Sequence, residues 1–297
     1  MKTTFRIAQP YQEIFLKCAE EFVNPSPARP ERFIRKMKEN TGMAGAVFGF
    51  ADEDGLEKKN PLIAAIGDSV TAGHFEALMT EEIKAKMGSI FAAIGAGEGP
   101  ERIKEIIEKM GGVPAVEVYD ARESYIEKFR TALIDKYEYT SVSVINSGIA
   151  GDHLISMMDR LERDVLRYSP DLVLINGSLN WDDTHFGDAD YYKTLLQSMV
   201  RRIKETTDAD IILLTPNGDL PNTLLGDAAA EPTTALRAEK IREVAAEENV
   251  CLADVRAVWD AAEKAGCPWE KLLANGINHP SVEGHEVYAK VLMKLFE

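Results

Sequence analysis

One serine in this chain occupies a position where an α/β sheet would place a nucleophile. Ser69 ends the stretch PLIAAIGDS at 61–69, in which a short apolar run leads directly into a turn of small residues. Such a run predicts a buried parallel strand, and open α/β sheets bind their ligands just outside the carboxyl ends of their strands. A Gly-Asp-Ser tripeptide alone is weak evidence, so the prediction depends on partners at the ends of other strands.

Three further loops contain such partners. They have the sequences NSGIAGD at 146–152, NGSLNWD at 176–182 and NGINHPS at 275–281. Each loop precedes a helical pattern, so we expect all three at the same edge of the sheet as Ser69. A seryl hydroxyl that attacks a carbonyl needs a neutral imidazole to take its proton and hydrogen-bond donors for the oxyanion that forms.

His279 is the candidate base. The helix that we expect after it begins with a positive dipole end, which disfavours the imidazolium and keeps the base neutral. The candidate oxyanion donors are the main-chain N–H of Ser69, the main-chain N–H of Gly151 and the side-chain amide of Asn180. A glycine at position 151 lets a tetrahedral intermediate approach the main chain closely.

These blocks together resemble the SGNH (GDSL) hydrolase family, from about residue 60 to the end of the chain. Gly67-Asp68-Ser69 matches the first block of the family, and the loop 146–152 matches the second, whose oxyanion glycine falls on Gly151. Asn180 matches the asparagine of the third block, and His279-Pro280 matches the fifth. The resemblance implies a flavodoxin-like α/β/α fold and hydrolysis of esters or thioesters, often with deacetylation of carbohydrates.

The chain departs from the family pattern at three positions. Ser178 replaces a glycine and Trp181 an aspartate in the third block, and Gly276 replaces the aspartate that usually lies three residues before the histidine. The carboxylate that orients the histidine in the family is therefore missing. Asn275, a main-chain carbonyl or a water is left to orient His279, which predicts a Ser–His dyad.

Four residues are predicted to contact the substrate or to orient the catalytic groups: Asp68, His74, Trp181 and Asn275. Trp181 could stack on a sugar, although a solvated acidic loop is an equal alternative. His74 could line the pocket or form a buried hydrogen bond. His285 is expected to be structural, because its spacing from His279 does not suit a zinc pair and no third ligand is near. We expect no metal and no cofactor.

The elements that must position these residues form a regular alternation. Short apolar runs occur at 62–66, 141–145, 172–175, 211–214 and 250–253, with helical patterns near 75–85, 122–136, 152–168, 188–206, 232–248, 255–265 and 282–296. Strands that alternate with helices in this way predict a parallel sheet covered on both faces. The expected fold is a three-layer α/β/α sandwich with a five-stranded parallel sheet.

The chain is expected to have two parts. Residues 1–60 are predicted to form an N-terminal helical extension packed on the core, and residues 61–297 to form the hydrolase domain. A helical insertion near 80–119 interrupts the alternation and could act as a lid or contact surface. It contains GAGEGP at 95–100, which does not complete G-x-G-x-x-G and so disfavours a dinucleotide site.

Composition limits the partners. The 34 basic and 49 acidic residues give a net charge of −15, which disfavours nucleic acid and anionic membrane surfaces. No apolar run approaches the length that spans a bilayer, and no signal peptide is recognisable, so we expect a cytoplasmic protein. The three cysteines are widely spaced and are expected to be reduced. Composition leaves the oligomeric state open.

The best hypothesis from the sequence is a serine esterase that hydrolyses short acyl esters, in particular acetyl esters on a sugar. An acyltransferase or a thioesterase would use the same residues and differ in the acceptor or the leaving group. A non-catalytic carbohydrate-binding or scaffold protein on the same fold is the alternative from another class. The missing aspartate before His279 and the altered third block are the observations that motivate it.

Overall fold

The computed structural model describes residues 5–40, 60–77, 81–112, 117–138, 140–221 and 233–297. The central strands are β1 (Leu62–Gly67), β4 (Ser143–Gly148), β5 (Leu172–Asn176), β6 (Asp210–Leu214) and β7 (Cys251–Ala253). The main helices around them are α1 (Tyr11–Glu21), α2 (Glu31–Glu39), α7 (Tyr125–Lys136), α8 (Leu154–Asp164), α10 (Ala189–Thr206), α11 (Thr234–Glu247), α12 (Val255–Lys264) and α13 (Val282–Met293). Two short helices, α4 (Ser69–Ala72) and α9 (Asp183–Phe186), follow β1 and β5.

The five strands form one parallel sheet in the order β4-β1-β5-β6-β7. Numbered by their sequence order within the sheet this is 2-1-3-4-5, the flavodoxin-like arrangement, so the expected fold is confirmed. The order reverses between β1 and β5, and such a switch point is where open α/β sheets leave a crevice for ligands. Ser69 comes two residues after the end of β1, at this switch point.

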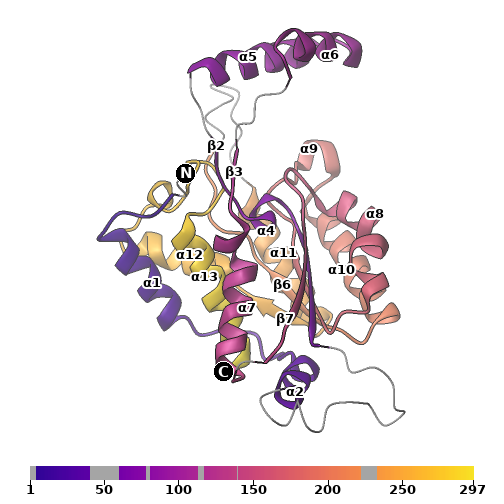
Figure 1. Cartoon of the computed structure of the whole chain (residues 1–297), viewed down its shortest axis with the longest axis vertical. Helices are drawn as coiled ribbons and strands as arrows, with labels where there is room; N and C mark the ends of the chain where they lie inside the picture. The colour runs from indigo at the N-terminus through magenta and orange to yellow at the C-terminus, as the bar shows by residue number, and fades with distance from the viewer. Residues whose placement is uncertain (1–4, 41–59, 78–80, 113–116, 139, 222–232) are drawn as a thin grey trace.

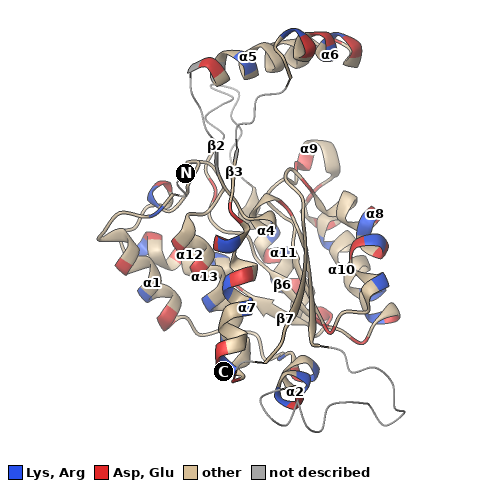
Figure 2. Cartoon of the chain, in the orientation of Figure 1, with Lys and Arg blue, Asp and Glu red and all other residues tan. Residues whose placement is uncertain are grey.

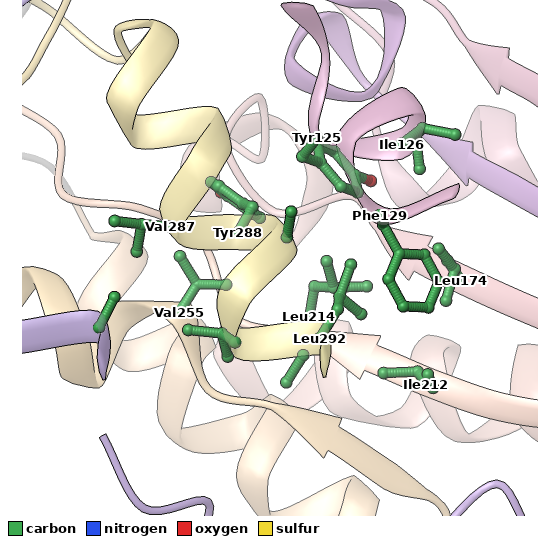
Figure 3. Packing of buried hydrophobic residues seen from close by; sticks show 14 of the residues in the cluster. Tyr125, Ile126, Phe129, Leu174, Ile212, Leu214, Val255, Val287, Tyr288 and Leu292 are labelled. Atoms are coloured by element: carbon green, nitrogen blue, oxygen red, sulfur yellow. The ribbon is translucent and has the colours of Figure 1, made fainter. Parts of the chain in front are cut away.

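Alternate residues of the strands face opposite layers of helices. Ile63 and Ala65 of β1 belong to a buried cluster with side chains of α1, α7, α12 and α13. Ala64 and Ile66 belong to a second cluster, with side chains of α8, α10 and α11. Figure 3 shows part of the first cluster, in which α7 and α13 cover the strands that carry Leu174 and Leu214. The period of two in each strand therefore produces the three layers.

The N-terminal helices join this core. Phe15 of α1 packs edge-on against Trp259 of α12, with ring centroids 5.1 Å apart, and both side chains are fully buried. Phe33 and Met37 of α2 belong to the same cluster. Burying these side chains stabilises the fold by about 1.5–3 kcal/mol each.

The cysteines Cys18, Cys251 and Cys267 are all free thiols.

The segment predicted as a helix near 75–85 differs from expectation. Its first three residues belong to the strand β2 (His74–Ala77), which pairs antiparallel with β3 (Glu117–Tyr119), and the helix α5 (Glu81–Gly95) covers its last five. Pairing with a segment far along the chain outweighs local helical preference here. α5 and α6 (Pro100–Lys109) stand out from the body above this two-stranded ribbon (Figure 1).

The helix pair α5–α6, which we call the arm, has a mixed surface. Acidic and basic side chains alternate along α6 (Figure 2). On α5 two large apolar side chains are exposed, Phe91 by 42% and Ile94 by 53%. In the described part of the chain no helix is both long and apolar enough to cross a bilayer.

Candidate active site

Ser69 and His279 form a direct contact. Ser69 Oγ lies 3.0 Å from Nε2 of His279, although 210 positions separate the two residues in the chain. Ser69 is the first residue of α4, and the preceding Asp68 caps this helix by accepting a hydrogen bond from the main-chain N–H of Val70 over 3.0 Å. Both members of the pair are buried, Ser69 being 4% and His279 8% exposed. The geometry allows Nε2 to accept the hydroxyl proton.

The turn that presents Ser69 requires glycine at position 67. A Cβ on Gly67 would lie 2.0 Å from Oγ1 of Thr71 and 2.6 Å from the carbonyl oxygen of Asn176. The close approach of β5 and the tight turn into α4 leave no space for a side chain there. The first block of the sequence motif therefore has a steric reason as well as a chemical one.

The His279 imidazole is held neutral by its surroundings. Burial, followed by the neighbouring His74, lowers the pKa of His279 to about 3. Its Nδ1 atom is buried and has no hydrogen-bond partner among the residues that the structure describes. This agrees with the absence of an aspartate three residues earlier, where Gly276 adopts a left-handed conformation with φ +69°.

Asn275 orients the main chain of His279 rather than its ring. Its Oδ1 accepts hydrogen bonds from the main-chain N–H groups of Ile277 (3.0 Å), Asn278 (2.9 Å) and His279 (2.9 Å). Such an Asx-type turn fixes the loop that carries the histidine. The imidazole itself is in contact with another ring, that of His74, at a centroid distance of 4.4 Å.

The candidate oxyanion donors come from three separate loops. The side-chain amide of Asn180 donates to the main-chain carbonyl of Asp152 over 3.0 Å, which places it beside Gly151. Gly151 has a left-handed φ of +74° and open space where a Cβ would be. Within the described residues, neither the main-chain N–H of Ser69 nor that of Gly151 donates a hydrogen bond. Both are available to a bound oxyanion.

The carboxyl end of β4 contacts α4 directly. The side chain of Asn146 donates to the carbonyl of Thr71 over 2.8 Å and accepts from the N–H of Gly148 over 3.0 Å. A Cβ on Gly148 would lie 2.2 Å from the nitrogen of Ala72, so this contact is possible only with glycine. The asparagine and glycine of the second motif therefore dock its loop against the helix that begins with Ser69.

Residues 65–287 match the model of the GDSL-like Lipase/Acylhydrolase family. This chain belongs to that family. The resemblance to SGNH (GDSL) hydrolases inferred from the motifs is thereby confirmed, and the chain is a carboxylic ester hydrolase.

The individual proteins that this GDSL-like hydrolase resembles share only about a quarter or less of its aligned residues. An acetylxylan esterase from Geobacillus stearothermophilus is 26% identical over 174 residues, which are 53% of this chain and 74% of that protein. The solved structure of an acetylxylan esterase from the same organism aligns with a TM-score of 0.53 at 22% identity, covering 79% of this chain and 93% of the other. A putative GDSL-like lipase from Parabacteroides merdae aligns with a TM-score of 0.55 at 20% identity, covering 80% and 95%. These two structures support the fold.

Trp181 does not offer a stacking face to a sugar, and that prediction is wrong. The residue is 4% exposed, and its indole N–H donates to the carbonyl of Gly187 over 2.8 Å. Its ring packs in the second buried cluster, 5.1 Å from the ring of Tyr192. The tryptophan that replaces the aspartate of the third motif thus fills the core of this GDSL-like hydrolase.

The other histidines and Asp68 have distinct environments. His285 is fully buried and accepts a hydrogen bond at Nδ1 from the N–H of Tyr125 over 3.1 Å, as a structural residue would. His153 is the N-terminal cap residue of α8.

Burial raises the pKa of Asp68, directly before the candidate nucleophile, to about 7. Among the described residues no group of three or more potential ligands is placed to hold a metal ion.

Two buried arginines of this hydrolase were not singled out from the sequence. Arg160 of α8 donates to the carboxylate of Asp152 (2.8 Å) and to the main-chain carbonyl of Gly67 (3.1 Å), so it joins the first and second motifs. Arg237 of α11 donates to the main-chain carbonyl of Ser178 over 2.9 Å, in the loop that carries Asn180. Arginines at helical spacing carry no sequence pattern that distinguishes them from surface residues.

Proposed function

We propose that this chain is a serine esterase that removes short acyl groups, in particular acetyl, from a carbohydrate. The contact of 3.0 Å between Ser69 Oγ and His279 Nε2, at the switch point of the sheet, is the observation that carries the proposal. The acetylxylan esterase among the relatives supports an acetylated sugar as the substrate. The acidic net charge is consistent with an uncharged substrate.

In the first half of the reaction Ser69 Oγ attacks the acyl carbonyl carbon while His279 Nε2 accepts the hydroxyl proton. The carbonyl oxygen becomes an oxyanion, which accepts hydrogen bonds from the N–H groups of Ser69 and Gly151 and from the Asn180 amide. When this intermediate collapses, the imidazolium returns the proton to the departing sugar oxygen. The products are the free sugar hydroxyl and an acyl-serine.

The second half repeats these roles with water. His279 takes a proton from a water molecule as its oxygen attacks the acyl carbon, and the same three donors hold the second oxyanion. Collapse breaks the bond to Ser69 Oγ, which regains its proton from the imidazolium. The carboxylic acid leaves, and the protein returns to its starting state.

The test is esterase activity with and without the serine hydroxyl. Hydrolysis of p-nitrophenyl acetate and labelling by a fluorophosphonate probe are both expected to disappear in Ser69→Ala. Hydrolysis and labelling are both expected to persist in Ser89→Ala, because the Ser89 hydroxyl donates a hydrogen bond to a main-chain carbonyl within the arm. Undiminished hydrolysis by Ser69→Ala would contradict the proposal. A folded wild-type protein that neither reacts with the probe nor hydrolyses the ester would favour the non-catalytic alternative.

The substrate class is tested separately, by acetate release. Acetylated xylo-oligosaccharides, an acetyl thioester and p-nitrophenyl esters of increasing chain length are compared by kcat/KM. We expect acetylated sugars and the shortest ester to be preferred. A preference for the thioester would identify a thioesterase. Loss of the acetyl group from one sugar with its appearance on another, without acetate release, would identify an acyltransferase.

A further inference from the structure

The imidazole of His279 lacks the usual means of orientation. Its Nδ1 has no hydrogen-bond partner in the described part of the chain, and Asn275 holds only its main chain. An imidazole that is held only by the contact of its Nε2 with Ser69 is free to rotate about its side-chain torsion angles. Such rotation would move Nε2 away from the Ser69 hydroxyl. Because a general base acts only within hydrogen-bond reach of the proton it takes, such turning would lower the rate.

A neighbouring ring restricts this motion. The imidazole of His74 is fully buried and packs against that of His279, with centroids 4.4 Å apart and planes inclined by 33°. His74 is also stacked on Tyr119, with centroids 4.1 Å apart and planes inclined by 12°. Three rings are therefore in series, and the last of them, Tyr119, is 48% exposed.

The ribbon below the arm places two of these rings together. His74 and Tyr119 are paired residues of β2 and β3. Gly73, which ends α4 with a left-handed φ of +83°, turns the chain from the candidate nucleophile directly into this ribbon. A Cβ on Gly73 would lie 3.1 Å from Cα of Ala121, so the turn also depends on close packing against the end of the ribbon. The position of His74 is thereby tied to that of Ser69.

His74 is suited to pack against a catalytic base because its own ring stays uncharged. Burial lowers the pKa of His74 to about 4, so the ring is uncharged at neutral pH. Although His74 contributes to the low pKa of His279, burial is the larger cause, and at neutral pH the ring of His74 carries no charge of its own to set against the imidazolium that forms during each half of the reaction. A permanently charged neighbour at this distance would oppose it.

We propose that His74 is a positioning residue: its ring, backed by Tyr119, holds the His279 imidazole on Ser69, the task that a carboxylate performs in related hydrolases. This inference rests on the proposed function, and it assigns part of the active site to the ribbon that carries the arm. In this role His74 acts through the ring of His279 and takes no part in the proton transfer itself. The ring of this residue, rather than its nitrogen atoms, is what the base requires.

The experiment compares His74→Phe, which keeps a flat ring, with His74→Ala, which removes it. In His74→Ala we expect kcat for p-nitrophenyl acetate to fall by about 10- to 100-fold with KM little changed, because misplacement of a catalytic group acts on the chemical step. The rate of fluorophosphonate labelling should fall in parallel. His74→Phe should restore most of both, and melting temperatures of all variants are recorded.

Two outcomes would overturn the inference: wild-type kcat in His74→Ala, or equal losses in the alanine and phenylalanine variants. If His74→Ala does not fold, Tyr119→Ala and Tyr119→Phe take its place, because Tyr119 is half exposed. The alanine variant should then lose kcat and the phenylalanine variant should not; equal kcat values would overturn the inference. Failure of the proposed function is distinguishable, since it would appear as full activity in Ser69→Ala.

Discussion

The side-chain amide of Asn180 donates one hydrogen bond to the main-chain carbonyl of Asp152, over 3.0 Å. An asparagine amide carries two N–H groups, so this contact fixes the side chain and leaves the second N–H free to donate. The anchor is the residue next to Gly151, and two of the three candidate oxyanion donors are therefore held in a common frame. Such preorganisation is the source of oxyanion stabilisation, since no reorientation is needed during the reaction.

Replacing Asn180 tests this role. Asn180→Ala should lower kcat for p-nitrophenyl acetate by roughly 10²–10³-fold with a small change in KM, the usual effect of removing one oxyanion donor. Asn60→Ala is the control, because Asn60 precedes β1 at the opposite edge of the sheet. A loss of less than about threefold in Asn180→Ala would exclude it from the oxyanion hole.

The ion pair between Arg160 and Asp152 is expected to be structural and strong. The Asp152 and Arg160 side chains are only 6% and 7% exposed. Arg160→Met should lower the free energy of unfolding by about 3–5 kcal/mol, because it leaves a buried carboxylate without its cation. Adding Asp152→Asn should recover part of this loss. Urea unfolding followed by tryptophan fluorescence measures the stability of both variants. A loss of less than about 1 kcal/mol in Arg160→Met would mean that this ion pair contributes no more than an exposed salt bridge does.

The pH dependence of activity should reflect the burial of His279. The base acts in its neutral form, and burial lowers its pKa to about 3. We therefore expect the acid limb of kcat/KM to lie below pH 5 instead of near the ordinary histidine value of about 6.5. Initial rates are measured from pH 4 to pH 8, and samples returned to neutral pH control for unfolding. An acid limb centred near pH 6.5 would contradict a buried base.

An aspartate at position 276 should supply the missing carboxylate. Gly276 has φ +69° and open space where a Cβ would be, and aspartate and asparagine are among the residues found most often in this conformation after glycine. Gly276→Asp should raise kcat by roughly tenfold and move the acid limb to higher pH, since a carboxylate stabilises the imidazolium. Gly276→Asn is the uncharged control. Equal kcat/KM profiles for the two variants would show that position 276 does not reach the imidazole.

Asp68 should make stability depend on pH. Burial raises its pKa to about 7, so the folded state holds the proton more strongly than the unfolded state. The stability that the neutral carboxyl contributes is complete below about pH 4 and is lost as pH rises to about 7. Asp68→Asn stays neutral and keeps the helix cap. Its free energy of unfolding relative to wild type should rise by roughly 2–3 kcal/mol between pH 5 and pH 8.

Urea unfolding at these two pH values provides the measurement. Asp135→Asn, at an exposed position on α7, is the control and should show no such trend. A constant difference between Asp68→Asn and wild type would mean that Asp68 is charged in the folded state throughout this range.

Much of the site could be predicted because its information is local. Three of the four motifs lie at or directly after the end of a strand, and the parallel topology brings such segments to one edge whatever the intervening helices contain; the fourth directly precedes α13. Gly67 and Gly148 are glycines because neighbouring main chain leaves no space for a Cβ, so they appear in the sequence as part of the motifs. The period of two in the strands likewise predicts which residues face each helical layer.

Three features that depend on tertiary packing rather than on a sequence motif could not be predicted. β2 forms a strand because it pairs with β3, while its own sequence resembles a helix. Trp181 lies in a polar loop sequence, yet its ring is buried, because the aromatic residues of the helices that follow pack around it. The buried position of Arg160 depends on the approach of Asp152 and Gly67 from two other elements.

The parallel α/β architecture, the family and the candidate nucleophile, base and oxyanion donors can all be inferred from residue order alone, because the motifs recur at the ends of the repeated strand and helix units. The surroundings of the base, in contrast, become visible only in the folded chain. The contact of His279 with His74, the stacking of His74 on Tyr119 and the anchoring of Asn180 on Asp152 each join elements that are remote in the chain. Such contacts depend on how whole layers pack, and local residue patterns do not encode that packing.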